Sequence, residues 1–170
     1  MMKQIKRLFV TVGTTQFDSL IKEVTSVPVL DVLANLGFTH VNLQIGRGTY
    51  EPTEIAETNI TPCITYYRFK DSLVDDIAEA DLVICHAGAG SIMDSLGAKK
   101  HVLVVINEEL MGNHQSELAA KLAKDNYLYY CSVPLLYKSL PSYDFNLLQP
   151  FPPGEPHKFA DFLDKTLGFV

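Results

Sequence analysis

The sequence has few cysteines, few basic residues and only short apolar runs. Three cysteines stand among its 170 residues, widely spaced inside apolar stretches: Cys63, Cys85 and Cys131. That pattern is typical of small buried side chains in a reducing compartment, and it excludes a disulfide framework or a cysteine metal site. Fourteen basic residues stand against 20 acidic ones, a net charge of -6. An acidic chain without a basic run is not expected to bind nucleic acid.

The apolar runs are all much shorter than the roughly 20 residues that a membrane-spanning helix needs. The run nearest the start, residues 8–12, ends at Gly13 and is too short for the core of a signal peptide. We therefore expect a cytoplasmic chain with no membrane span of its own.

Several sequence motifs of known chemistry are also missing. There is no G-x-x-x-x-G-K-[ST] phosphate loop, no G-x-S-x-G nucleophile turn and no Asp-x-Asp pair that would hold a metal with a diphosphate. The dinucleotide fingerprint is broken, because the third glycine is absent after Gly88 and Gly90. We expect no metal and no cofactor.

Short apolar runs alternate with amphipathic stretches along the chain. Strands are expected over residues 7–12, 41–45, 64–69, 82–85, 101–107 and 128–133, with helices at 17–24, 29–36, 71–80, from 91, at 115–124 and at 156–167. This order predicts an α/β fold with a doubly wound, mostly parallel, Rossmann-like sheet. We expect one α/β domain over residues 1–133, a proline-rich linker over 134–155 and a C-terminal helix over 156–170 that packs on the domain.

Residues 80–96, ADLVICHAGAGSIMDSL, organise the rest of the chain. A buried strand is followed by a glycine turn and a helix, which leaves free backbone N–H groups at a helix N-terminus where a diphosphate binds well. Taken alone, the glycines could equally serve close strand–helix packing. The parallel topology, however, brings the turns after several strands to one edge of the sheet, where ligands bind in such folds. That convergence favours a binding site.

The candidate site residues all fall in these turns. The candidate substrate-binding residues are Gly13, Thr14, Thr15, Arg47, Gly88, Ala89, Gly90, Ser91, Asp94, Asn107, Glu108, Asn113, His114 and Gln115. His86, directly before the glycine turn, is the candidate catalytic residue, although a histidine there is often only satisfied by local backbone. Arg47 suits a phosphate or a structural carboxylate. Asp94 suits a ribose diol or plain solvent, and Asn113 suits a sugar or a helix cap.

The motifs FVTVGTTQFDSLI, LQIGRG, YRFKDSL, ADLVICHAGAGSIMDSL and VVINEELMGNHQSELA together resemble a known family. The sequence is similar to the catalytic subunits of the two-subunit UDP-N-acetylglucosamine transferases of the dolichol pathway. More distantly, it resembles the C-terminal half of MurG-type family 28 glycosyltransferases. The resemblance implies the donor-binding half of a metal-independent, inverting GT-B enzyme. Such a subunit transfers GlcNAc from UDP-GlcNAc to GlcNAc-PP-dolichol on the cytosolic face of the endoplasmic reticulum.

The resemblance also implies roles for the candidate residues. The turn at residues 13–15 would face the donor phosphate or the acceptor cleft, and His86 with residues 88–91 would hold the diphosphate. Asp94 would hold the ribose, although the family more often has Glu there. Residues 113–115 would read the sugar hydroxyls and the N-acetyl group.

A partner is implied as well. A two-domain enzyme needs about twice this length, and the lipid-linked acceptor lies in a membrane, so we expect a membrane-anchored, acceptor-binding partner subunit. The expected C-terminal helix carries an apolar stripe that suits this interface: Phe159, Phe162, Leu163 and Leu167. An alternative function is a noncatalytic nucleotide-sugar-binding scaffold or sensor. A dinucleotide-dependent enzyme is disfavoured by the broken fingerprint.

Overall fold

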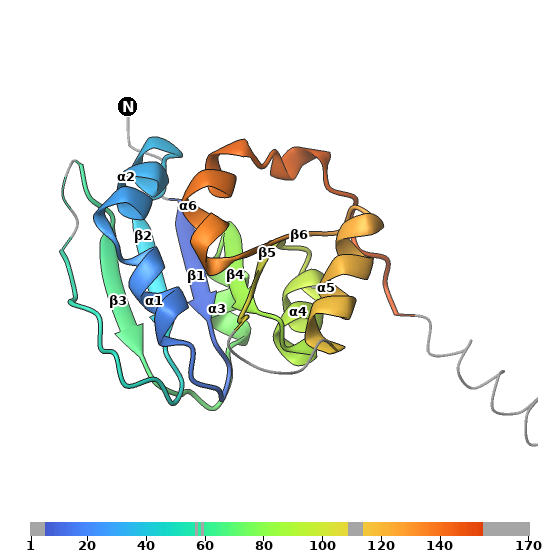
Figure 1. Ribbon diagram of the computed structural model, residues 1–170, viewed down its shortest axis with the longest axis horizontal. Coiled ribbons are helices and arrows are strands. Elements are labelled where there is room, and N and C mark those ends of the chain that lie inside the picture. Colours follow the sequence, from blue (N-terminus) through green and yellow to red (C-terminus); the bar gives the residue numbers. More distant parts are fainter. Residues whose placement is uncertain (1–5, 57, 59, 109–113, 155–170) are drawn as a thin grey trace, which may run out of the picture.

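The computed structural model describes residues 6–56, 58, 60–108 and 114–154. Six strands form one sheet in the order β3-β2-β1-β4-β5-β6, and every neighbouring pair is parallel (Figure 1). The strands are β1 (Arg7–Thr11), β2 (His40–Gln44), β3 (Cys63–Tyr67), β4 (Leu82–His86), β5 (His101–Ile106) and β6 (Tyr129–Ser132). The predicted doubly wound, Rossmann-like α/β sheet is confirmed.

Helices cover both faces of the sheet, which is why the strands are apolar on both sides. On one face lie α1 (Asp18–Val24), α2 (Val27–Asn35) and α6 (Leu136–Ser139); on the other lie α3 (Val74–Glu79), α4 (Ala89–Gly97) and α5 (His114–Lys124). Alternate residues of β1 serve the two layers: Leu8 and Val10 face the α1–α2 side, and Phe9 faces the α3–α4 side. No described helix is both long and apolar enough to span a membrane.

Residues 134–154 differ from the expected linker. Three short 3₁₀ turns, η1 (Val133–Leu135), η2 (Leu140–Ser142) and η3 (Phe145–Leu147), flank α6, and the leucines Leu136 and Leu140 are buried in the core beside α2. Two of the prolines that suggested an extended segment stand in the first turns of η1 and η2, where proline starts a helix instead of breaking it. The expected helix at 156–170 lies outside the described residues.

The topology places one junction at the centre of the edge formed by the carboxyl ends of the strands. The chain runs outward from β1 to β2 and β3, then returns to β4 on the other side of β1. The turns after β1 and β4 therefore diverge to opposite faces, which opens a crevice between them. This junction is where a doubly wound sheet binds its ligand.

Candidate functional site

His86 stands at the β1–β4 junction, clamped between two glycines. It ends β4, and its ring lies so close to Gly88 that a Cβ at that position would overlap the imidazole. A Cβ at Gly13 would lie 2.8 Å from His86 Cε1 on the other side. Gly13 also has a φ of +63°, in the left-handed region that favours glycine. Both glycines are thus needed to admit the histidine ring.

The imidazole of His86 is incompletely satisfied. Its Nδ1 is buried and has no hydrogen-bond partner among the residues that the structure describes. Burial lowers the pKa of His86, and a backbone hydrogen bond involving Thr11 offsets this only in part. Because the pKa is lowered, the ring is mostly neutral at pH 7.

Helix α4 begins directly after this ring with free backbone donors. Its N-cap is Gly88, which has no side chain to cap the helix, and the first backbone bond runs from Ile92 N to Gly88 O at 3.1 Å. The N–H groups of residues 89–91 consequently have no partner within the helix. A Cβ at Gly90 would meet nothing within 4 Å. Close strand–helix packing therefore does not explain Gly90, and the positive end of a helix is a suitable place for an anion.

Gln44, at the end of β2, ties the ends of three strands together. It is buried, and its Oε1 accepts hydrogen bonds from Gly13 N at 2.9 Å and from Thr11 Oγ1 at 2.5 Å. Its Nε2 donates to Gly13 O at 2.8 Å and to Arg68 O at 2.7 Å. Gln44 thereby fixes the Gly13 turn beneath His86. The sequence analysis missed Gln44. The feature that could have indicated it is a polar residue at the end of an apolar strand, one residue before a glycine turn.

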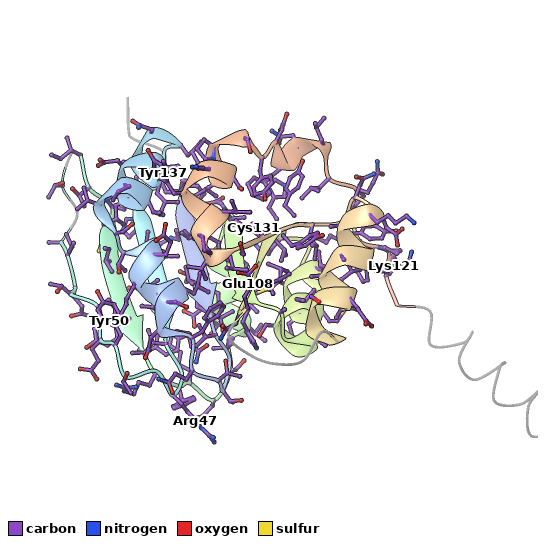
Figure 2. All side chains as sticks on the ribbon, in the orientation of Figure 1. Arg47, Tyr50, Glu108, Lys121, Cys131 and Tyr137 are labelled. Carbon is purple, nitrogen blue, oxygen red and sulfur yellow. The ribbon has the colours of Figure 1, made fainter. Side chains whose placement is uncertain are left out.

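The turn of Gly46, Arg47 and Gly48 follows β2 beside the Gly13 turn. Gly46 has a φ of +56°, and a Cβ there would lie 2.7 Å from Gly13 O. Arg47 N donates to Thr15 O at 3.0 Å. Both glycines are buried, whereas Arg47 is exposed and points outward from the edge (Figure 2).

Two side chains brace this turn, and the sequence analysis missed both. The carboxylate of Asp18 accepts from Thr49 N at 3.1 Å, from Thr49 Oγ1 at 2.7 Å and from Tyr50 N at 3.2 Å. From the other side, Arg68 Nη1 donates to Gly46 O and Gly48 O, and Arg68 Nη2 pairs with Glu51 at 2.6 Å. Desolvation would raise the pKa of Asp18, but hydrogen bonds, from Gln16 as well as from Thr49 and Tyr50, outweigh it and lower the pKa to about 2.

The other candidate residues lie at the same edge. Thr15 Oγ1 donates to Val12 O at 2.8 Å and closes the first turn, while Thr14 is exposed. Asp94 is exposed on α4, one turn after Ser91. Glu108 and Asn107 line a hollow of about 160 Å³ with Ser19 and Pro134.

The structure describes less of the last predicted cluster. Asn113 lies outside the described residues, and His114 and Gln115 begin α5, though their side chains are not described. The described residues hold no group of three side chains suited to a metal ion. Larger hollows lie away from this edge, one of about 260 Å³ against α3 and one of about 340 Å³ at the amino ends of the strands.

Comparison with known proteins identifies the family to which this edge belongs. The model of the glycosyltransferase family 28 C-terminal domain matches residues 7–165. The chain belongs to this family. The UDP-N-acetylglucosamine transferase subunit ALG13 of Mus musculus is 48% identical over 132 residues, which cover 78% of this chain and 11% of the mouse protein. The chain thus spans only a small part of that relative.

Solved structures show the same fold. An NMR solution structure of ALG13 matches with a TM-score of 0.69 at 28% identity, covering 94% of this chain and 96% of that chain. MurG of Acinetobacter baumannii matches with a TM-score of 0.64 at 18% identity, covering 87% of this chain and 44% of MurG. The resemblance inferred from the motifs is confirmed, and the family 28 domain has the fold of about half of a GT-B glycosyltransferase.

Proposed function

We propose that the chain is the donor-binding subunit of a UDP-GlcNAc-dependent glycosyltransferase. It would transfer GlcNAc from UDP-GlcNAc to GlcNAc-PP-dolichol, the second step of lipid-linked N-glycan precursor synthesis, with inversion of the anomeric centre. Membership of family 28 and the name of the mouse relative support this proposal. The observation that carries it is the start of α4, where the N–H groups of Ala89, Gly90 and Ser91 have no partner among the described residues and a Cβ at Gly90 would meet nothing within 4 Å.

The donor diphosphate would lie against Ala89, Gly90 and Ser91, whose N–H groups point along the positive end of the helix dipole. His86 would hydrogen-bond the same diphosphate from a neutral ring. Asp94 would accept from the ribose, one helical turn further on. Residues 13–15 would face the sugar side of the diphosphate, and the loop that contains residues 107–108 and 113–115 would read the sugar hydroxyls and the N-acetyl group.

This arrangement stabilises the leaving group of the transfer. As the bond from the anomeric carbon to the UDP oxygen breaks, negative charge builds on the diphosphate, and the helix N–H groups already point at it. We propose that these donors do the work that a metal ion does elsewhere. A catalytic role for His86 stays a prediction, since no ion pair joins its ring to a carboxylate among the described residues.

The partner would supply the acceptor half of the cleft. The chain matches 44% of the MurG chain, and the mouse relative is named as a subunit. We propose a membrane-anchored partner that recruits this chain to the cytosolic face of the endoplasmic reticulum. The apolar stripe of residues 159–167 would pack at that interface. Deleting residues 161–170 should abolish co-purification with the partner, and undiminished co-purification would exclude the segment from the interface.

A transfer assay tests the function directly. Purified chain is mixed with UDP-GlcNAc and a GlcNAc-PP-lipid, with and without a membrane fraction that contains the partner. We expect transfer only with both components, and a β-linked product. Saturable UDP-GlcNAc binding without transfer in the complete mixture would instead support the noncatalytic scaffold. Saturable binding of NAD and not of UDP-GlcNAc would contradict both functions.

A further inference from the structure

The turn at Gly46–Gly48 presents an exposed cation, Arg47. The guanidinium of Arg47 is exposed, and in the part of the chain that the structure describes it has no hydrogen-bond or ion-pair partner. We propose that Arg47 binds the diphosphate of the lipid-linked acceptor, and that Asp18 and Arg68 are positioning residues that hold its turn. This inference rests on the proposed function.

The backbone beneath Arg47 is held from three sides. Asp18 fixes the residues that follow the turn, through its bonds to Thr49 and Tyr50. Arg68 binds the carbonyl oxygens of both glycines, at 3.3 Å and 2.6 Å. On the inner side, Arg47 N is bonded to the turn after β1. So many bonds on an exposed turn fix where its side chain starts, which lowers the ordering cost of binding a ligand.

The position of Arg47 separates it from the donor diphosphate. Arg47 follows β2, and Gly88 follows β4, with β1 between the two strands. Two strand spacings put the ends of β2 and β4 about 10 Å apart. The Gly13 turn and the ring of His86 fill the space between them. A diphosphate bound to the α4 N–H groups would therefore lie near the Arg47 turn without contacting its backbone.

The proposed reaction requires a second anion at about this place. The acceptor hydroxyl belongs to a sugar that is itself joined to a diphosphate, so the acceptor diphosphate lies one sugar ring from the reacting carbon. The donor diphosphate and the acceptor diphosphate must thus lie near the same anomeric carbon without overlapping. Two sites that are two strands apart allow this. A guanidinium binds phosphate oxygens through paired hydrogen bonds. Because the chain carries a net charge of -6, such an anion needs a local cation.

Kinetics of the complex with its partner tests the assignment. The substitution R47Q removes the charge, and K121Q on α5 is the control for loss of a surface cation, because Lys121 is exposed and pairs only with Asp125 among the described residues. We expect R47Q to raise the acceptor KM about tenfold, as loss of a charge-assisted pair does. The donor KM should stay within about twofold. R47K keeps the charge without the paired geometry and should fall between wild type and R47Q.

A double-mutant cycle tests the positioning role. D18N leaves one acceptor oxygen and turns an N–H group toward the turn, so it should raise the acceptor KM about threefold. If Asp18 acts through Arg47, D18N should add nothing in the R47Q background. A merely structural loss would instead raise both KM values and would add to R47Q. D125N, which removes an exposed carboxylate on the far side of the domain, is the control.

Three results would overturn the proposal. The first is an equal rise of the donor KM and the acceptor KM in R47Q, and the second is no change in either. The third is weaker co-purification of R47Q with the partner while the acceptor KM of the remaining complex is unchanged. That third result would make Arg47 a partner contact. If the wild-type complex transfers nothing, the proposed function fails and binding still decides the site. Farnesyl diphosphate in detergent micelles is then titrated into the complex at saturating UDP. Weaker binding to R47Q than to K121Q supports the second site, and equal binding overturns it.

Discussion

The two central turns of the strand-end edge are built in opposite ways. At the β1–β4 junction, the described residues leave a buried nitrogen of His86 and the first N–H groups of α4 without partners, and a Cβ at Gly90 would meet nothing within 4 Å. At the Gly46–Gly48 turn, two half-buried side chains are heavily bonded: Asp18 receives four hydrogen bonds and Arg68 makes three. Polar groups thus stay unsatisfied at the proposed donor site, whereas hydrogen bonds hold the backbone of the turn that carries Arg47.

The energetic scale makes this contrast informative. A buried polar group without a partner costs about 1–3 kcal/mol, a large share of the stability of a domain. We expect the donor diphosphate to supply the missing partners. The Gly46–Gly48 turn does not carry this free-energy cost, and its exposed Arg47 side chain can contact another molecule.

The largest effect is expected from closing the junction with G88A. The new Cβ would overlap the imidazole of His86, so the ring must leave its place. We expect UDP-GlcNAc affinity to fall roughly 100-fold, about 2.7 kcal/mol, together with a cost of about 1–3 kcal/mol in stability from overpacking. Titration calorimetry and thermal unfolding measure the two quantities. Unchanged donor affinity would show that the ring position does not matter for binding.

Two glycines of α4 offer a sharper comparison. Neither Gly90 nor Gly97 has an atom within 4 Å of an added Cβ, so both should accept alanine and gain about 0.5–1 kcal/mol in helix stability. Only Gly90 lies at the strand-end edge. G90A should therefore weaken UDP-GlcNAc binding about tenfold, and G97A should not weaken it. If both variants bind alike, the space at Gly90 is not a ligand site.

The pH dependence of stability tests the buried histidine. Because burial lowers the pKa of His86, the unfolded chain binds more protons than the folded one below the usual value of 6.5. The stability present above that pH is lost as the pH falls, with a slope of at most about 1.4 kcal/mol per pH unit. Urea unfolding of H86Q between pH 8 and pH 5 should show a shallower dependence than wild type. Identical slopes would contradict a neutral, buried ring.

The smallest effect on stability is expected at Asp18, which holds the turn that carries Arg47. The lowered pKa of Asp18 means that its contribution is present above the usual 3.8 and is lost as the pH falls to about 2. D18N should cost about 1 kcal/mol at pH 7, after allowing for solvent screening. The difference from wild type should vanish near pH 2 in urea unfolding. A constant difference across that range would mean that Asp18 acts through packing and not through its charge.

Backbone features were predictable from the sequence because they depend on local patterns. Runs such as Leu82–Cys85 and the glycines after them predicted the strands, the sheet topology and the edge that carries the turns. The segment from η1 to η2 was interpreted as a linker because its two buried leucines, Leu136 and Leu140, lie on elements of three or four residues, too short to show a periodicity in the sequence.

The supporting side chains could not be predicted, since their partners are distant in the sequence. Gln44 reaches residues 31 positions earlier and 24 positions later, and Asp18 binds a loop 31 positions on. Nothing near either residue indicates those bonds. The burial of His86 was equally hidden, because it depends on Gly13 packing against the ring from another strand.

Amide chemical-shift mapping during titration with UDP-GlcNAc tests the central claim most directly. Saturating donor should shift the backbone amides of Ala89, Gly90 and Ser91, with those of Gly13 and His86, and should leave the hollow against α3 at Asn42 and Thr65 unchanged. The largest shifts appearing at Asn42 and Thr65, with residues 88–91 unmoved, would contradict the account.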